Sequence, residues 1–516
     1  MNKISLSEIC YYIFFVLLLM AKGAGLYDGQ PVFKILLVTA MVFWMIKMAL
    51  TAYTQRELIT VLLLLMLGGI VYLVSGEKGA LLYIMMITGL KNVPVKRVFL
   101  VGCVSWGIVF VTMAWIHAIG LLEGPFKVHD KFGLGMVIRW GLGYSHPNVL
   151  HVSYLVMVVF LVYILNEQFC WKWALCLMAG NMLIFLYSLS STGVIVVTFY
   201  LMLSLYWKYR GRLSKVEKVL IQLALPACVL FSLAAPFWLQ GKWFDIVNNI
   251  VNTRLSLAKY FLSLKPPTLF GVRHSEIVTS LLTMDNSYVF AFVTYGIVLF
   301  VIIVLGYVIL VHQYCKEQKG GELCLILACF VGGVTEPFLF NTSFKNISLL
   351  FMKDIIFEEN KAADMHLLEH FEKEFVFSGE RVSVFAKALR DVWKKKNTIL
   401  LAAVIGFVIG SIGYQNFKKD PVQIIVPRSE CEINNLEDAA VYLSLADIAA
   451  LGESKVLGYV DNQTEMLVYS GNIVRLEHLR GIISCGMTGG ALLVMAVYII
   501  NVFYRKLLGL LKCRND

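Results

Sequence analysis

The stretch ELITVLLLLMLGGIVYLVS, residues Glu57–Ser75, carries one charged side chain in nineteen positions. An α-helix of about 20 apolar residues is long enough to cross the hydrocarbon core of a bilayer. Runs of this kind recur along the 516 residues, of which 59% are hydrophobic and only 15% charged. The chain is therefore predicted to be an α-helical polytopic membrane protein, and an ordinary soluble fold is excluded.

We expect about 12 + 2 transmembrane helices, twelve before residue 358 and two after it. The first is expected to stay in the protein, because no convincing small-residue cleavage site follows it. The expected spans lie near 9–22, 31–50, 57–75, 79–90, 98–118, 148–165, 172–188, 192–207, 216–239, 287–311, 322–340, 344–357, 398–414 and 486–503.

Basic residues predict the orientation of these spans. With the N-terminus inside, they gather in the cytoplasmic loops, as the positive-inside rule requires of a multi-pass membrane protein. Those residues are Lys91, Lys96, Arg97, Lys208, Arg210, Arg212, Lys215, Lys218, Lys394, Lys395, Lys396, Arg505, Lys506, Lys512 and Arg514. The net charge of +11 thus reflects topology and membrane lipid, and no nucleic-acid partner is expected.

The spacing of cysteines and glycines excludes several kinds of chemistry. Of the eleven cysteines, only Cys431 and Cys485 are expected to face or border the outside, so no disulfide framework is predicted. The sequence contains no CxxC pair, HExxH, Walker loop or GxGxxG fingerprint. Neither a metal nor a cofactor is expected.

The chain divides into three parts. Two long outer loops carry more basic than acidic residues, which indicates an anionic ligand outside. A charged cytoplasmic linker then leads to a two-span hairpin around an acidic outer segment. The expected limits are 1–357 for the polytopic domain with outer loops 119–147 and 240–286, 358–397 for the linker, and 398–516 for the hairpin with outer segment 415–484.

Two histidines stand at the start of a predicted span, in GYSHPNVLH (143–151). Pro147 suits the first turn of a helix, which places His146 at the cap. Asn148 and His151 are three residues apart and share one helix face. An interfacial cap with a solvated imidazole explains them. An ionisable residue at membrane depth is equally a functional candidate, and histidine exchanges protons near neutral pH.

Arginine interrupts an apolar face in VNNIVNTRLSLAKYFLSL (247–264). The spacing predicts one amphipathic helix with Arg254 in the middle of its apolar side. A guanidinium there needs an anionic partner, and its planar fork suits a phosphate. A structural ion pair, or snorkelling to the interface, is the alternative.

Polar residues also flank the later spans. Arg273 and His274 follow a turn at Gly271, and Asp285 with Asn286 opens the next span; helix capping alone accounts for the latter two.

Two smaller signals remain. SLSSTG (188–193) predicts a polar turn with a cap at Ser191 or Thr192. Glu336, before Pro337, puts a carboxylate near a span's outer end, where it requires a partner.

In this order, GYSHPN, SLSSTG, the R…LFG…DNSY…YG series and TEPFLFN…N resemble the Wzy-type bacterial polysaccharide polymerases over residues 1–357. That resemblance implies an enzyme that joins oligosaccharide repeat units carried on undecaprenyl diphosphate, at the outer face and without nucleotide sugars. It also implies an assembly system that includes a flippase and length regulators, for capsule, exopolysaccharide or O-antigen.

By the same resemblance, Arg254 is the main diphosphate ligand, supported by Arg139 and Arg273. His146 is the catalytic base, with Asp285 as its rival. The other residues expected to line the substrate site are Asn148, His151, Ser191, Thr192, His274, Asn286, Tyr288 and Glu336.

The C-terminal hairpin resembles, more distantly, the polysaccharide co-polymerases that determine chain length. VQIIVP (422–427) predicts a strand and LEDAAVYLSLADIAAL (436–451) a helix, which together make a small α/β segment. The segment is short for that family, and no proline-rich motif precedes the second span. We expect residues 358–516 to tune polymer length, to self-associate and to leave the chemistry alone.

Two other functions use similar features. An O-antigen ligase would share the donor and the arginines but use a different acceptor. A lipid-linked oligosaccharide flippase would concentrate polar residues at the bilayer midplane, often in two matching halves. Here the polar residues gather at outer helix ends and no halves match.

Overall fold

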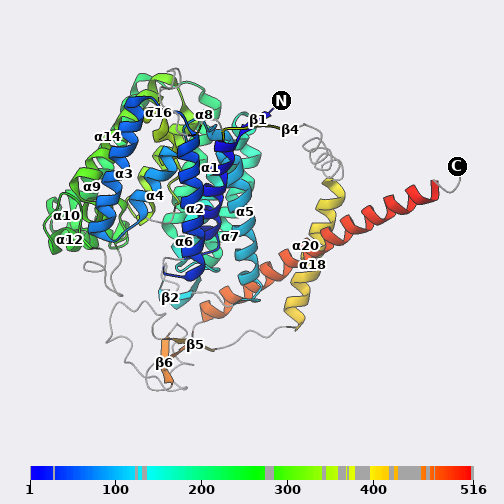
Figure 1. Cartoon of the computed structure of the whole chain (residues 1–516). Coiled ribbons are helices and arrows are strands. Elements are labelled where there is room, and N and C mark those ends of the chain that lie inside the picture. Colours follow the sequence, from blue (N-terminus) through cyan, green and yellow to red (C-terminus); the bar gives the residue numbers. More distant parts are fainter. Residues whose placement is uncertain are drawn as a thin grey trace.

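Long helices packed side by side form the body of the protein in the computed structural model (Figure 1). The structure describes residues 2–26, 29–122, 126–130, 136–273, 284–339, 344–357, 368, 371–377, 396–417, 423–427, 455–460, 465–469 and 471–512. Within these residues, ten helices are long and apolar enough to cross a membrane, so the chain is a multi-pass membrane protein.

Apart from α20, the spanning helices begin and end close to the predicted positions. They are α1 (Leu6–Gly23), α2 (Pro31–Leu50), α3 (Gln55–Ser75), α5 (Val95–Ala118), α6 (Pro147–Leu165), α8 (Ser191–Arg210), α9 (Lys215–Leu233), the continuous α13 (Ser287–Phe290), π-helical η3 (Ala291–Tyr295) and α14 (Gly296–Glu317), then α18 (Lys396–Phe417) and α20 (Gly471–Lys512).

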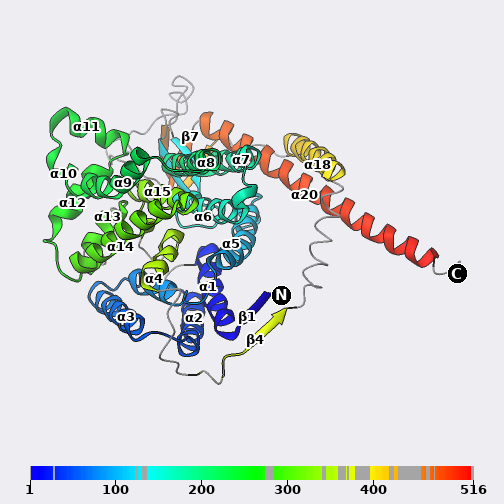
Figure 2. The same ribbon diagram turned by 90° about the horizontal axis from the view of Figure 1, so that it is seen from above.

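Three further helices are apolar. α7 (Trp171–Ser188) packs against both α6 and α8, whereas α4 (Gly79–Thr88) and α15 (Gly320–Gly333) have 10 and 14 residues. At 1.5 Å per residue, α4 is only about 15 Å long, half the thickness of a hydrocarbon core. Figure 2 shows α4 surrounded by longer helices.

The predicted span over 344–357 is wrong. This segment forms a 3₁₀ helix, η5 (Ile347–Met352), and one helical turn, α16 (Lys353–Ile356). It lies along α14: Tyr307 and Ser348 share a hydrogen bond of 2.8 Å, and Tyr314 donates one of 2.7 Å to Asp354. All six residues of η5 are buried. These residues are therefore apolar because they face the protein interior, where irregular backbone is tolerated.

The N-terminus is fixed by a short sheet. Strand β1 (Asn2–Ser5) pairs antiparallel with β4 (Glu374–Phe377), and Lys3 forms an ion pair of 2.7 Å with Glu374. The segment after the polytopic domain that contains β4 thus returns to the end of the bundle where β1 lies. Figure 1 shows this end opposite to the one that carries β2 and α12.

At that opposite end, the described residues of loop 119–147 include two paired strands. Strand β2 (Phe126–Asp130) pairs antiparallel with β3 (Met136–Trp140), in a register that places Lys127 opposite Arg139.

The predicted span over 216–239 is observed as two helices, α9 and the short α10 (Ala235–Trp238) that follows it.

The C-terminal hairpin consists of α18 and α20 in close contact. A Cβ added at Gly410 would overlap the carbonyl of Cys485, and one at Gly406 would overlap that of Gly489. Small residues of the GxxxG type allow helices to approach this closely. Helix α20 begins at Gly471, so the second span extends well before the predicted residue 486 and the segment between the helices is shorter than 415–484.

That segment contains a three-stranded antiparallel sheet of order β5–β7–β6. Its strands are β5 (Gln423–Pro427), β6 (Lys455–Val460) and β7 (Glu465–Tyr469). β5 coincides with the predicted strand. The predicted helix 436–451 and Cys431 lie outside the described residues.

Candidate functional site

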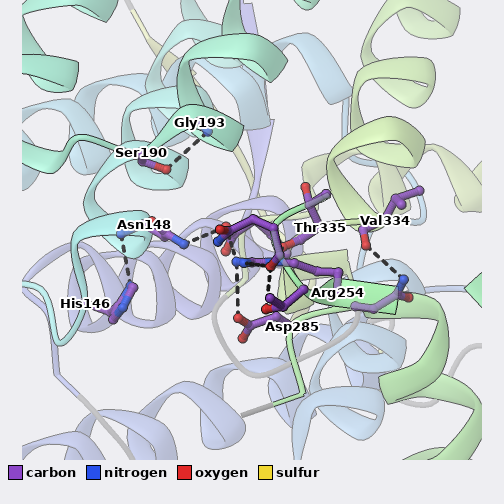
Figure 3. Close-up of polar contacts among 12 residues, drawn as sticks. His146, Asn148, Ser190, Gly193, Arg254, Asp285, Val334 and Thr335 are labelled. Atoms are coloured by element: carbon purple, nitrogen blue, oxygen red, sulfur yellow. Dashed lines mark hydrogen bonds and ion pairs between the residues drawn. The ribbon is translucent and has the colours of Figure 1, made fainter. Parts of the chain in front are cut away.

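Three successive main-chain carbonyls after α15 organise the site. Asn286 Nδ2 donates to Val334 O at 2.8 Å, Arg254 Nε to Thr335 O at 3.3 Å, and Ser287 Oγ to Glu336 O. The carbonyls at a helix C-terminus lack intrahelical partners and attract donors and cations. The end of α15 thereby binds two other segments of the chain, one at Arg254 (Figure 3) and one at Asn286 and Ser287.

Arg254 occupies the first turn of α12 (Arg254–Leu264). The predicted single amphipathic helix is broken at Asn252 and Thr253, whose φ angles of 53° and 64° are left-handed. The preceding helix, α11, ends at Ile250. This break turns Arg254 inward, where its side chain is 9% exposed. Its Nη1 donates to Asn252 O at 2.8 Å, so two main-chain carbonyls set the plane of the guanidinium.

Two carboxylates face the same guanidinium. Arg254 Nη2 lies 3.2 Å from Asp285 Oδ2 and 3.9 Å from Glu336 Oε1 (Figure 3). The Asp285 side chain is 26% exposed and that of Glu336 only 7%. The anionic partners expected of an arginine on an apolar helix face are therefore present, and Asp285 is the member of this trio nearest to solvent.

Asn148 connects Glu336 to a second arginine. Its Nδ2 donates to Glu336 Oε1 at 2.8 Å, and its Oδ1 accepts from Arg139 Nη2 at 2.7 Å. Arg139, at the end of β3, also donates through Nε to Ser188 O, the final carbonyl of α7. The amide thus separates a buried cation from a buried carboxyl and binds both.

Lys345 was not predicted as a site residue. It is buried, donates to Val149 O at 3.0 Å and lies 5.6 Å from the centre of the Tyr144 ring. A signal was present, because a lysine at the start of an apolar run is a functional candidate in a membrane protein. We call Arg139, Asn148, Arg254, Asp285, Glu336 and Lys345 the Arg254 cluster.

Burial shifts the pKa values of two members of the cluster, both of which lie outside the ten helices of spanning length. It raises the pKa of the Glu336 carboxyl to about 7; Asp285 adds to this, and Arg254, Lys345 and Arg139 oppose it. It lowers the pKa of the Lys345 ammonium to about 7, against the attraction of Glu336. Glu336 can therefore gain or lose a proton near neutral pH.

The two histidines of GYSHPNVLH lie apart from this cluster. His146 is the N-cap of α6, where its Nδ1 accepts a hydrogen bond of 3.2 Å from the Asn148 N–H. Figure 3 shows it on the far side of Asn148 from Arg254. His151 is fully buried between α6, α7 and α8, where Nδ1 lies 2.9 Å from Ser188 Oγ and Nε2 lies 2.7 Å from Asn181 Oδ1. The structure thus gives both histidines a helix-cap or packing role.

The SLSSTG turn also caps a helix, at a different residue from those predicted. Ser190, rather than Ser191 or Thr192, is the N-cap of α8, and its side chain accepts from the Gly193 N–H at 3.2 Å. Ser191 and Thr192 form the first turn and are partly exposed.

Two more of the predicted residues, Asn286 and Tyr288, make structural contacts. Asn286 caps α13 through the N–H groups of Tyr288 and Val289, and its amide reaches Ser232 on α9 at 2.9 Å. Tyr288 lies in the core, where its hydroxyl donates to Phe330 O at 2.9 Å.

Arg273 is exposed and lines a surface pocket with Lys265 and Thr268, apart from the contacts of Arg254. His274 lies outside the described residues.

Comparison with known proteins gives no relative for this chain: no protein-family model, curated protein or solved structure matches it. Among the described residues, no group of three His, Cys, Asp or Glu side chains is arranged to hold a metal ion. The chemistry of the site therefore depends on the side chains of the Arg254 cluster.

Proposed function

We propose that the Arg254 cluster binds the diphosphate of a polyprenyl-linked oligosaccharide and transfers its glycan, so that repeat units are polymerised. One observation carries this proposal: two buried arginines and a buried, protonatable carboxyl form one connected network. A diphosphate suits such a network, because the planar forks of two arginines can bind phosphate oxygens in pairs.

Each side chain has a role in the proposed reaction. Glu336 accepts the proton of the acceptor hydroxyl as that oxygen bonds to the anomeric carbon of the donor sugar. The bond from this carbon to the diphosphate breaks, and the lipid diphosphate leaves with the electron pair. Arg254 and Arg139 stabilise the leaving charge. Asp285 holds Arg254 in the resting state and exchanges places with the diphosphate.

This assignment replaces His146 as the base. The carboxyl of Glu336 is connected to both arginines, whereas His146 uses Nδ1 to cap α6. A base works best when its pKa is near the working pH, and burial brings the pKa of Glu336 to about 7.

The proposed topology places the cluster outside the plasma membrane and β1–β4 in the cytoplasm. The chain then returns inward through residues 76–94 and 346–357, neither of which contains a helix of spanning length. If both returns are counted as crossings, the proposed topology has 12 + 2 crossings, although the predicted helical span over 344–357 is not present. Between α18 and α20, the sheet β5–β7–β6 would lie outside the membrane.

Reconstitution tests the proposal. Purified full-length protein in phospholipid vesicles is given a synthetic undecaprenyl-diphosphate oligosaccharide, and the products are separated by size. A ladder of repeat units with release of undecaprenyl diphosphate is expected. Transfer of one unit to a different acceptor would show a ligase. Movement of the donor across the bilayer with no new glycosidic bond would show a flippase.

A further inference from the structure

Helix α20 is attached to the polytopic body by one buried arginine. Arg480 Nε and Nη2 donate to Leu186 O at 2.9 and 2.7 Å, Nη2 also donates to Tyr187 O at 3.2 Å, and Nη1 donates to Ile138 O at 2.9 Å. The side chain pairs with Glu477 and is 2% exposed as a residue. Arg480 thus binds two elements of the body, α7 and β3.

Neighbouring contacts extend this attachment along α20. Trp140 Nε1 lies 3.2 Å from both carboxylate oxygens of Glu477, Tyr187 hydrogen-bonds to Ser484, and Trp115 Nε1 donates to Thr488 at 3.1 Å. The contacts cover three turns of α20. The C-terminal hairpin therefore has a defined docking surface on the body.

Two arginines share the carboxyl end of α7. Arg480 binds the carbonyls of Leu186 and Tyr187, and Arg139 binds the next one, Ser188. Both arginines also involve strand β3. Arg139 is one of its residues, and Arg480 donates to the carbonyl of Ile138, the residue before Arg139. Unpaired carbonyls at a helix end favour such cations. From Arg139, hydrogen bonds continue through Asn148 to Glu336.

We propose that Arg480 is a positioning residue: it fixes β3 against the end of α7 and so holds Arg139 in the Arg254 cluster. The C-terminal hairpin is then a working part of the site as well as a candidate regulator of length. This changes the expectation drawn from the sequence, because a chain cut after residue 357 loses Arg480 and exposes the carbonyls that it binds. The catalytic part of this inference rests on the proposed function; the docking part does not.

Docking is tested on the full chain. A specific protease site is inserted after β4, between residues 378 and 394, and the purified protein carries an affinity tag at its N-terminus. After cleavage, the C-terminal piece is expected to stay bound to the tagged body. Arg480→Ala should release it, whereas Arg475→Ala, an exposed arginine on the same helix, should not. Retention of the piece by Arg480→Ala at wild-type level overturns the docking role.

Positioning is tested by combining substitutions and measuring the rate of polymer formation. Loss of hydrogen bonds from a charged group should lower the rate of uncleaved Arg480→Ala about tenfold or more. If Arg480 acts through Arg139, the double variant Arg139→Ala/Arg480→Ala is no slower than Arg139→Ala alone. If the two substitutions lower the rate independently, so that the double variant is slower by the product of the two effects, the coupling between Arg480 and Arg139 is overturned. Arg480→Lys should restore docking more fully than rate, because one ammonium cannot bind both β3 and α7.

A variant that fails to fold is recognised by its elution profile in detergent. If Arg480→Ala fails to fold, Arg480→Lys is compared with the wild type in its place. Release of the C-terminal piece together with normal polymer synthesis overturns the positioning role and leaves docking intact. If Arg254→Ala, which is remote from the docking surface, forms polymer normally, the proposed function fails and the docking result still stands.

Discussion

Asn148 donates a hydrogen bond of 2.8 Å to Glu336, and this contact joins the first turn of α6 to the chain that follows α15. The two residues are 188 positions apart in the sequence. On its other side the same amide accepts from Arg139, so its orientation is set by both partners. Replacement of this single amide would separate Arg139 from the carboxyl that we propose as the base.

Substitution of Arg254 tests whether polymer formation requires the planar guanidinium group or only its positive charge. Arg254→Ala should abolish polymer formation, and Arg254→Lys should restore at most about a tenth of it, because each lost charge-assisted hydrogen bond costs about 1.5–3 kcal/mol. Lys259→Ala removes an exposed positive charge from the same helix and serves as the control. Full activity of Arg254→Lys would mean that long-range charge is sufficient.

Glu336 should control the acid side of the pH profile. Burial raises its pKa, so the carboxyl becomes protonated as the pH falls below about 7, and a protonated carboxyl cannot accept the acceptor's proton. The rate of wild-type polymer formation should therefore fall about tenfold per pH unit below that value.

Glu336→Gln should be slow and lack this acid limb, while Glu322→Gln, at the other end of α15, should behave as wild type. Rates measured from pH 5 to 9 in vesicles check both variants, and an unchanged limb in an active Glu336→Gln protein would exclude Glu336 as the base.

His146 distinguishes a helix cap from a base. Asparagine caps a helix well but cannot accept a proton near neutral pH, so His146→Asn should keep stability and activity. His146→Ala should lose about 1 kcal/mol of stability through the missing cap. Thermal unfolding in detergent and polymer yield are measured together. If both variants unfold normally and make no polymer, the imidazole is the base after all.

The packing of His151 predicts a steric effect at Gly193. A Cβ at Gly193 would overlap the imidazole, which is held by Ser188 and Asn181. Gly193→Ala should therefore destabilise the protein by about 1–3 kcal/mol. Around a Cβ built at Gly107, no atom of the described residues lies within 4 Å, so Gly107→Ala should be neutral or stabilising. Equal thermal stability of the two variants would contradict the observed packing.

Local sequence determined the spanning helices, because hydropathy over about 20 residues reports transfer from water to an apolar environment. It also identified Arg254, since the apolar residues that follow at helical spacing place it on the buried side of α12, although the single helix predicted over 247–264 is broken at Asn252 and Thr253. The His146 cap was readable for the same reason: proline at the next position starts a helix.

Only the tertiary structure decided which polar residues meet. Glu336, Asn148 and Arg139 come from three separate elements or their ends, and their pairing depends on how α6, α15 and β3 pack, which no local pattern encodes. The error at 344–357 has the same origin, because residues facing the protein interior are as apolar as residues facing lipid. Arg480 lies within an apolar helix, and what it binds is set by a body whose residues are about 300 positions away. Hydropathy measures how much each segment avoids water; the identity of its neighbours follows from packing and hydrogen bonding between segments.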